Sequence, residues 1–136
     1  MARKAKTIVM DSWAIMAYLE DEPAGERIAD MIADARDNNI PLMMTVVNFG
    51  EVWYIIARRA SEADADRTIQ EIRQLGIQLV DAGWDLTRQA AYYKSKYRMS
   101  YADCFAAALA RHEKAHLVTG DKEFTAVEHE VSMVWV

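Results

Sequence analysis

The sequence predicts an α/β domain in which a mostly parallel central sheet is covered by helices on both faces. Two observations support this fold class. Short apolar runs alternate along the chain with longer amphipathic stretches, which is the order of strands and helices in βαβ units. Most of the apolar runs are continuous rather than alternating, as expected for parallel strands that are buried on both faces.

Five apolar runs are expected to form the strands. Turn signals separate them from the preceding helices, since Pro41 breaks the chain before the second run and Gly76 fits a helix end before the third. In chain order the strands are expected at Thr7–Met10, Leu42–Thr45, Ile77–Val80, Leu117–Thr119 and Val131–Val136.

The stretches between these strands carry apolar residues at helical spacing and are expected to be helices. The expected helices are Ser12–Glu20, Ala24–Asn38, Val46–Arg59, Glu62–Leu75, Asp85–Tyr97 and Ser100–Glu113, with a further short one at Lys122–Glu128.

Composition predicts one domain over residues 1–136, because a chain of this length with 52% hydrophobic residues can bury a core without disulfides. The net charge of −5 argues against a protein that coats nucleic acid by charge alone, although a local basic patch could still steer a polyanion. The single cysteine, Cys104, lies among apolar residues and indicates a buried thiol in a reducing compartment.

No segment of the sequence approaches the roughly 20 apolar residues that a membrane helix needs. The apolar stretch near the N-terminus ends at Asp11, which is too short for the hydrophobic region of a signal peptide. We therefore expect a cytoplasmic protein without a membrane span.

Four carboxylates are expected to meet at one edge of the sheet. Asp11 follows the first strand and Asp121 follows the fourth, while Asp103 lies in the first turn of its helix. Glu51 lies about a turn and a half into its helix and leans back toward the same edge, because helical side chains tilt toward the helix N-terminus. Functional groups of open α/β sheets gather beyond the carboxyl ends of the strands. Asp81 also ends a strand, where a turn or cap role is the better interpretation.

Each acid also has a local interpretation. Asp11 and Asp121 can cap helices, and Ser100 with Asp103 has the spacing of a capping box. Glu51 is harder to explain locally, because its helix is apolar around most of its circumference and a buried carboxylate tends to bind a proton or a cation. Four acids at one edge would repel each other unless a divalent metal joined them.

Carboxylate ligands favour hard cations such as Mg²⁺ or Mn²⁺, and such sites most often serve phosphoryl or phosphodiester chemistry. A zinc site is not indicated, because His112, His116 and His129 are scattered and no cysteine cluster exists. Asn48, one turn before Glu51, and Thr119, beside Asp121, are expected to fix the rotamers of the acids.

Taken together in this order, four segments resemble the PIN-domain ribonucleases, and most closely the toxin nucleases of VapBC toxin-antitoxin modules. The resemblance covers essentially the whole chain, with Glu123 standing where many relatives carry Asp. The segments are Val9-Met10-Asp11-Ser12, Thr45-Val46-Val47-Asn48-Phe49-Gly50-Glu51, Met99-Ser100-Tyr101-Ala102-Asp103 and Leu117-Val118-Thr119-Gly120-Asp121-Lys122-Glu123-Phe124.

This resemblance implies a PIN-like three-layer α/β/α sandwich and a Mg²⁺- or Mn²⁺-dependent endoribonuclease that hydrolyses RNA phosphodiester bonds. It implies that Asp11, Glu51, Asp103 and Asp121 carry one or two metal ions. It also implies a homodimer and a cognate antitoxin protein that inserts into the acidic crevice.

Bases and aromatic residues alternate just before Asp103, as in a track for single-stranded RNA. Lys94, Lys96 and Arg98 are therefore candidate RNA contacts. The alternative is that these bases only stabilise a helix end, where positive charge is favourable, while the tyrosines pack in the core.

Two other functions compete with the nuclease. A PIN-like module that binds RNA or protein without cleaving it would keep the fold and lose the chemistry. A metal-dependent phosphatase or phospho-acceptor domain also uses strand-end aspartates, but the Asp-x-Asp pair expected after the first strand is missing at Asp11.

Overall fold

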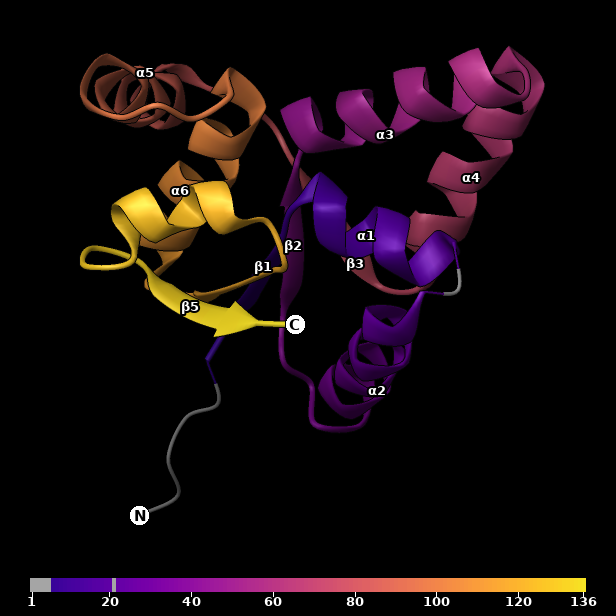
Figure 1. The fold of residues 1–136 in the computed structure, drawn as a ribbon. Helices are drawn as coiled ribbons and strands as arrows, with labels where there is room; N and C mark the ends of the chain where they lie inside the picture. Colours follow the sequence, from indigo (N-terminus) through magenta and orange to yellow (C-terminus); the bar gives the residue numbers. More distant parts are fainter. Residues whose placement is uncertain (1–5, 21) are drawn as a thin grey trace.

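The computed structural model describes residues 6–20 and 22–136 and contains a five-stranded, all-parallel sheet with strand order β3-β2-β1-β4-β5 (Figure 1). The predicted strands are confirmed with shifts of a residue or so at their ends. They are β1 (Ile8–Met10), β2 (Leu42–Thr45), β3 (Ile77–Val80), β4 (His116–Thr119) and β5 (Ser132–Trp135).

The predicted helices are confirmed in the same order, and the short one before β5 is a 3₁₀ helix. Ser100 caps the last long helix rather than starting it, and Tyr97 already has extended backbone. The helices are α1 (Ser12–Leu19), α2 (Pro23–Asp37), α3 (Val46–Arg59), α4 (Glu62–Gln74), α5 (Trp84–Lys96), α6 (Tyr101–Glu113) and η1 (Lys122–Val127).

Helices cover the sheet on both faces, which explains why the strands are apolar at successive positions. Val9 of β1 and Leu117 of β4 pack into a core formed with α5, α6 and η1. Their neighbours Met10 and Val118 point to the opposite face and pack with α1, α2 and α3. Figure 1 shows these two groups of helices on the left and right of the sheet. The architecture is therefore the three-layer α/β/α sandwich.

The strand order places a topological switch point between β1 and β4. The chain moves outward from β1 through β2 to β3 and then returns to the other side of β1 to form β4 and β5. In such sheets a crevice opens beyond the carboxyl ends of the two strands at the switch point.

Among the described residues, no helix is long and apolar enough to cross a membrane.

A close approach between α1 and the start of α2 depends on Gly25. A Cβ atom at this position would lie 2.7 Å from the carbonyl oxygen of Ala17. The same carbonyl accepts a hydrogen bond from the amide of Glu22 at 3.2 Å. Any larger residue at position 25 would push α2 away from α1, the helix that Asp11 caps.

Gly25→Ala is expected to lower the free energy of unfolding by about 1–3 kcal/mol, because the added methyl group meets backbone that cannot yield. Gly50→Ala is the matched control. Gly50 is an exposed glycine in α3 with open space around it, so alanine there should stabilise the helix by about 0.5–1 kcal/mol. Denaturant unfolding of both variants measures the two changes, and equal effects would contradict this account of Gly25.

Candidate active site

Asp11 begins α1 and is fully buried at the end of β1. Its Oδ1 accepts a hydrogen bond from the amide of Ala14 at 2.9 Å, which caps the helix. Its Oδ2 accepts one from the hydroxyl of Thr119 at 2.6 Å, and that hydroxyl oxygen also accepts the amide of Asp121 at 3.0 Å. Thr119 therefore links the acids that follow β1 and β4, the two strands of the switch point.

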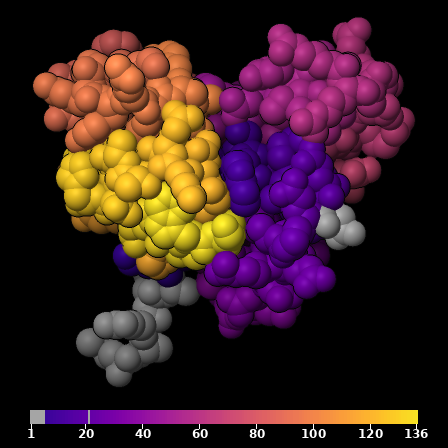
Figure 2. Space-filling model, in the orientation of Figure 1, coloured from indigo at the N-terminus to yellow at the C-terminus, as the bar shows by residue number. Residues whose placement is uncertain are grey.

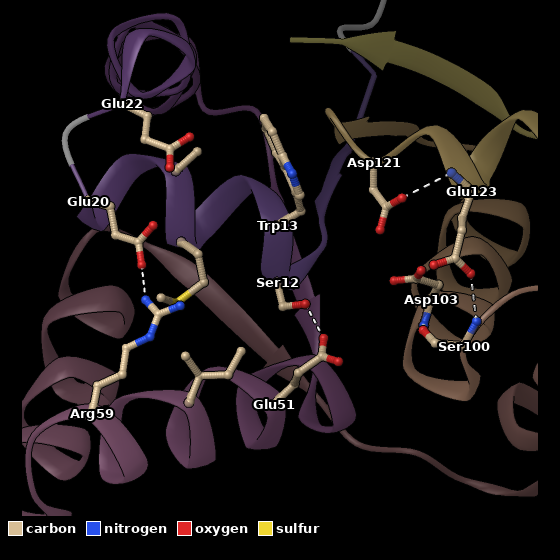
Figure 3. Close-up of a pocket in the computed structure, with 13 residues that line it drawn as sticks. Ser12, Trp13, Glu20, Glu22, Glu51, Arg59, Ser100, Asp103, Asp121 and Glu123 are labelled. Atoms are coloured by element: carbon tan, nitrogen blue, oxygen red, sulfur yellow. Dashed lines mark hydrogen bonds and ion pairs between the residues drawn. The ribbon is translucent and has the colours of Figure 1, made fainter.

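Asp103 is buried in the first turn of α6 and its carboxylate faces the crevice (Figure 3). Ser100 caps this helix by accepting the Asp103 amide on its hydroxyl at 3.1 Å. In a capping box the Asp103 carboxylate would accept the Ser100 amide in return. That amide instead donates to Oε1 of Glu123 at 3.0 Å. Glu123 thus takes over the local role and leaves the Asp103 carboxylate available.

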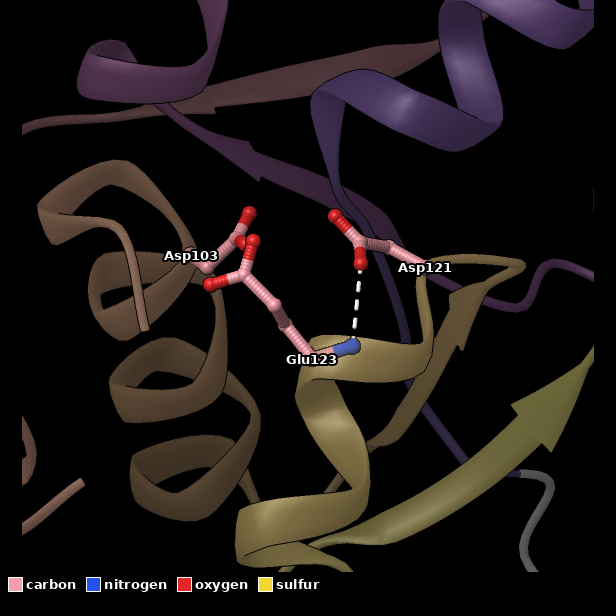
Figure 4. Close-up of side chains that lie close together, drawn as sticks. All are labelled: Asp103, Asp121 and Glu123. Atoms are coloured by element: carbon pink, nitrogen blue, oxygen red, sulfur yellow. Dashed lines mark hydrogen bonds between the residues drawn. The ribbon is translucent and has the colours of Figure 1, made fainter. Parts of the chain in front are cut away.

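Three carboxylates form the tightest acidic cluster among the described residues. One oxygen each from Asp103, Asp121 and Glu123 lies within 4.8 Å of the other two (Figure 4). Asp121 is held in place because its Oδ1 accepts the Glu123 amide at 3.0 Å at the start of η1. Sequence reasoning missed Glu123 as a member of this cluster. The signals for it in the sequence were its two-residue spacing from Asp121 and its place where many relatives carry Asp.

Glu51 lies across the cavity from this cluster, on the wall formed by α1 and α3 (Figure 3). It is partly buried, as its apolar helix predicts, and the hydroxyl of Ser12 donates a hydrogen bond to its Oε1. At the far end of the same wall, Arg59 forms an ion pair with Glu20.

The two walls enclose a cavity of about 400 Å³. Glu51, Asp103 and Asp121 all line it, whereas Asp11 lies buried behind its surface. Figure 2 shows the surface that belongs to the two walls, with η1 in yellow and α1 in violet lying next to each other. Three of the four predicted acids thus line one cavity, with Glu51 on the wall opposite Asp103 and Asp121 and with Glu123 added, and their binding of a metal stays a prediction.

Burial and mutual repulsion make two of these acids hard to ionise. Burial raises the pKa of Asp11 to about 7, with hydrogen bonds from Thr119 and Ala14 opposing the rise and the charges of Asp121 and Glu51 adding to it. Burial also raises the pKa of Asp103 to about 8, and the neighbouring negative charges raise it further. Asp11 and Asp103 therefore keep a proton to higher pH than an exposed aspartate does.

The donor set fits a hard divalent cation. Every ligating group in the cluster is a carboxylate oxygen, and no histidine or cysteine is found among the described residues that line the cavity. Oxygen ligands of this kind suit Mg²⁺ and Mn²⁺ rather than zinc. A divalent cation would also offset the burial and the repulsion that raise the pKa values of Asp11 and Asp103.

The two residues expected to fix the acid rotamers lie at different distances from them. Thr119 bonds directly to Asp11. Asn48 is buried, but its side-chain amide donates to the carbonyl of Ala102 at 3.2 Å, and its Oδ1 accepts the hydroxyl of Thr45 at 2.5 Å. Asn48 therefore ties α3 to the residue that precedes Asp103 rather than to Glu51.

The candidate RNA contacts do not line the acidic cavity. Lys94 donates from Nζ to the carbonyl of Met99 at 2.7 Å and so braces the loop between α5 and α6. Lys96 lies over the ring of Tyr92, with Nζ 5.8 Å from the ring centre, and Arg98 is exposed. Binding of RNA by these residues stays a prediction, and any such contact would lie outside the cavity.

An indole ring packs against the turn that carries Asp121. A Cβ atom at Gly120 would lie 2.2 Å from Cη2 of Trp13, so only glycine leaves room for the ring. Trp13 also lines the cavity (Figure 3). This contact sets the distance between α1 and the Asp121 turn.

Comparison with protein families gives a match to the PIN domain over residues 8–130. A comparison with curated protein sequences finds no match.

Solved structures with the same fold include toxin-antitoxin proteins. The Mycobacterium tuberculosis toxin VapC20, a sarcin-ricin loop cleaving toxin, is 18% identical with a TM-score of 0.71, covering 89% of this chain and 95% of that chain. VapBC2 from Rickettsia felis, bound to a promoter DNA fragment, is 12% identical with a TM-score of 0.76 and coverages of 94% and 97%. VapBC-1 from nontypeable Haemophilus influenzae is 15% identical with a TM-score of 0.72 and coverages of 95% and 97%. At these identities the likeness establishes the fold.

The stability of the metal-free protein is expected to fall as the pH rises from about 4 to about 8. Over this window the two aspartates are ionised in the unfolded chain but still protonated in the folded state. The free energy of unfolding falls with rising pH because the folded state binds more protons than the unfolded state. Thermal unfolding in EDTA across this range measures the fall. The fall should be smaller in Asp103→Asn and should diminish when Mn²⁺ replaces EDTA. A wild-type stability that did not change with pH would contradict the raised pKa values.

Gly120→Ala is expected to destabilise the protein by about 1–3 kcal/mol, because the added methyl group overlaps the indole of Trp13. Combining it with Trp13→Leu removes the ring that causes the overlap. The double variant should therefore lose less stability than the sum of the two single variants, a coupling that denaturant unfolding measures. Strict additivity would show that the two residues do not press on one another.

Proposed function

Because this chain belongs to the PIN domain family, we propose that it is a metal-dependent endoribonuclease that hydrolyses RNA phosphodiester bonds. The observation that carries the proposal is the cluster of Asp103, Asp121 and Glu123 in a cavity at the switch point of the sheet. Acids held this close, in a site where burial disfavours their charge, suit a cation and an anionic substrate rather than a structural role.

In this proposal the three clustered carboxylates hold Mg²⁺ or Mn²⁺, while Asp11 and Glu51 complete the negative field around it. When bound, the cation supplies the positive charge that offsets the cluster and the scissile phosphate and that activates water as a nucleophile. The fixed position of the carboxylates is the contribution of the protein, because Thr119 holds Asp11 and the Glu123 amide holds Asp121.

Glu51 is the proposed general base. The Ser12 hydroxyl occupies its Oε1 and orients the carboxylate, so the other oxygen can accept the proton of the attacking water. The water oxygen then bonds to phosphorus as the bond to the leaving oxygen breaks, and the leaving oxygen takes up a proton from solvent. Glu51 lies on the wall opposite the acidic cluster, which leaves space for the phosphate between Glu51 and the cluster (Figure 3).

The role of a toxin in a VapBC-type module belongs to the same proposal. Its support is the fold that the chain shares with VapC20, a sarcin-ricin loop cleaving toxin, and with the VapBC complexes. We extend the proposal to a homodimer and to a cognate antitoxin that enters the acidic cavity, where a basic side chain would be attracted. A cytoplasmic location is included, supported by the buried free thiol of Cys104.

Asp103→Asn is expected to reduce cleavage of single-stranded or loop RNA in Mg²⁺ or Mn²⁺ by about a hundredfold or more, since it removes one charge from the proposed metal site and keeps the side-chain volume. EDTA should abolish the wild-type activity. Cleavage of a labelled pool of structured RNAs measures both effects.

Asp81→Asn is the matched control, because Asp81 is an exposed acid that follows β3 and does not line the cavity. Asp81→Asn should cleave RNA like the wild type.

Calorimetric titration with Mn²⁺ separates the nuclease from the catalytically idle binding module, since the idle module need not bind the ion here. Full activity in Asp103→Asn would refute the assignment of the site.

A further inference from the structure

Trp135 lies at the same edge of the sheet as the acids. It is the last residue of β5 and pairs in parallel register with Thr119, the last residue of β4. Paired strands lie about 4.8 Å apart, and Thr119 is two residues before Asp121. Trp135 therefore lies one strand away from the turn that carries Asp121 of the acidic cluster.

A second cavity, of about 440 Å³, opens beside this tryptophan. Gly120 and Lys122 line it, whereas Asp121 between them lines the acidic cavity. Trp13 packs on Gly120 from the side of the acidic cavity. The two cavities are therefore neighbours, separated by a single turn of the chain. The residues that line the second one are Gly120, Lys122, Thr125, Glu128, Trp135 and Val136.

Two of the residues that line this cavity suit one nucleotide of a single strand. Trp135 is 37% exposed and offers a ring that any base can stack on, while Lys122 is an exposed cation beside it. The backbone of Trp135 is held by β4 and by Arg27, whose guanidinium donates to its carbonyl at 3.2 Å. A ring on a fixed backbone loses little freedom when a base stacks on it.

The C-terminal segment lies on the surface of the molecule. Figure 2 shows the yellow C-terminal segment on the viewed face, next to the violet α1 and α2. Trp84, in contrast, is 71% exposed at the start of α5 and lines neither of the two cavities. An exposed tryptophan elsewhere on the chain is thus available for comparison.

We propose that the second cavity binds the nucleotide next to the scissile phosphate, with its base stacked on Trp135 and its phosphate contacted by Lys122. The occupant is the single-stranded RNA of the proposed nuclease, so this inference rests on the proposed function. Stacking requires no particular base, and the cavity therefore positions the strand over the acids rather than reading its sequence.

The first experiment compares Trp135→Leu and Trp135→Phe by steady-state cleavage of a labelled single-stranded RNA of mixed sequence in Mn²⁺. Leucine keeps apolar bulk but has no ring, so KM should rise about tenfold with kcat little changed. Phenylalanine keeps a ring and should stay within about threefold of the wild type. Trp84→Leu is the control and should leave KM unchanged.

The second experiment measures the affinity of the same RNA for Asp103→Asn protein over a range of salt concentrations. Adding Lys122→Gln should lower the magnitude of the slope of log affinity against log salt by about 0.7, the value for one phosphate contact on a single strand. Lys114→Gln, an exposed lysine at the end of α6, is the charge-matched control and should leave the slope unchanged. Because Lys122 is exposed, this variant tests the cavity even if Trp135→Leu folds poorly.

Suppose that the wild-type chain cleaves RNA, that Trp135→Leu has an unchanged KM and that Lys122→Gln has an unchanged salt slope. These results would overturn this inference but not the proposed function, and would indicate that the cavity binds a protein partner instead. An equal loss in Trp84→Leu would overturn it as well. A wild-type chain that neither binds nor cuts RNA would overturn the proposed function and this inference with it.

Discussion

Burial of carboxylates beside one another at the carboxyl edge of the sheet is the constraint on which the rest of the structure depends. Asp11 and Asp103 are removed from water and lie near other acids, so their charged forms are destabilised. The protein compensates with hydrogen bonds, above all the one from the Thr119 hydroxyl that joins the ends of β1 and β4. Such an arrangement costs stability in the absence of a cation, and the two apolar cores on either side of the sheet offset that cost.

The site is precise because its two walls are connected behind the cavity. Asn48 ties α3 to the carbonyl of Ala102, and Trp13 fixes the separation of α1 from the turn at Gly120. The carboxylates therefore stand on helices and tight turns whose relative positions are set by packing. A metal site needs this rigidity, because ligands that move apart lose both affinity and geometry.

The two neighbouring cavities suggest a division of work along one edge of the sheet. The acidic cavity holds the charges that suit a cation and a phosphate, while the cavity beside Trp135 offers an aromatic ring and a lysine. Lys122 and Asp121 are adjacent residues that serve the two cavities separately. Positioning a substrate beside the reacting group makes a bimolecular step effectively intramolecular.

The sequence by itself determined the strands, the helices and the edge at which Asp11, Glu51, Asp103 and Asp121 gather. Hydrophobic periodicity and capping signals are local and can be read from the sequence. Because functional groups gather beyond the carboxyl ends of parallel strands, residues that follow these strands are expected at one edge of the sheet. Only the tertiary structure decided that Glu123 joins the cluster, that Asn48 bonds to Ala102, that Lys94 bonds to Met99 and that Trp135 borders a cavity. Most of these depend on contacts between elements far apart in the chain, and Lys94 and Glu123 depend on the exact path of a loop and a 3₁₀ turn. Periodicity does not encode such contacts, because it records which face of an element is buried and not which partner covers it.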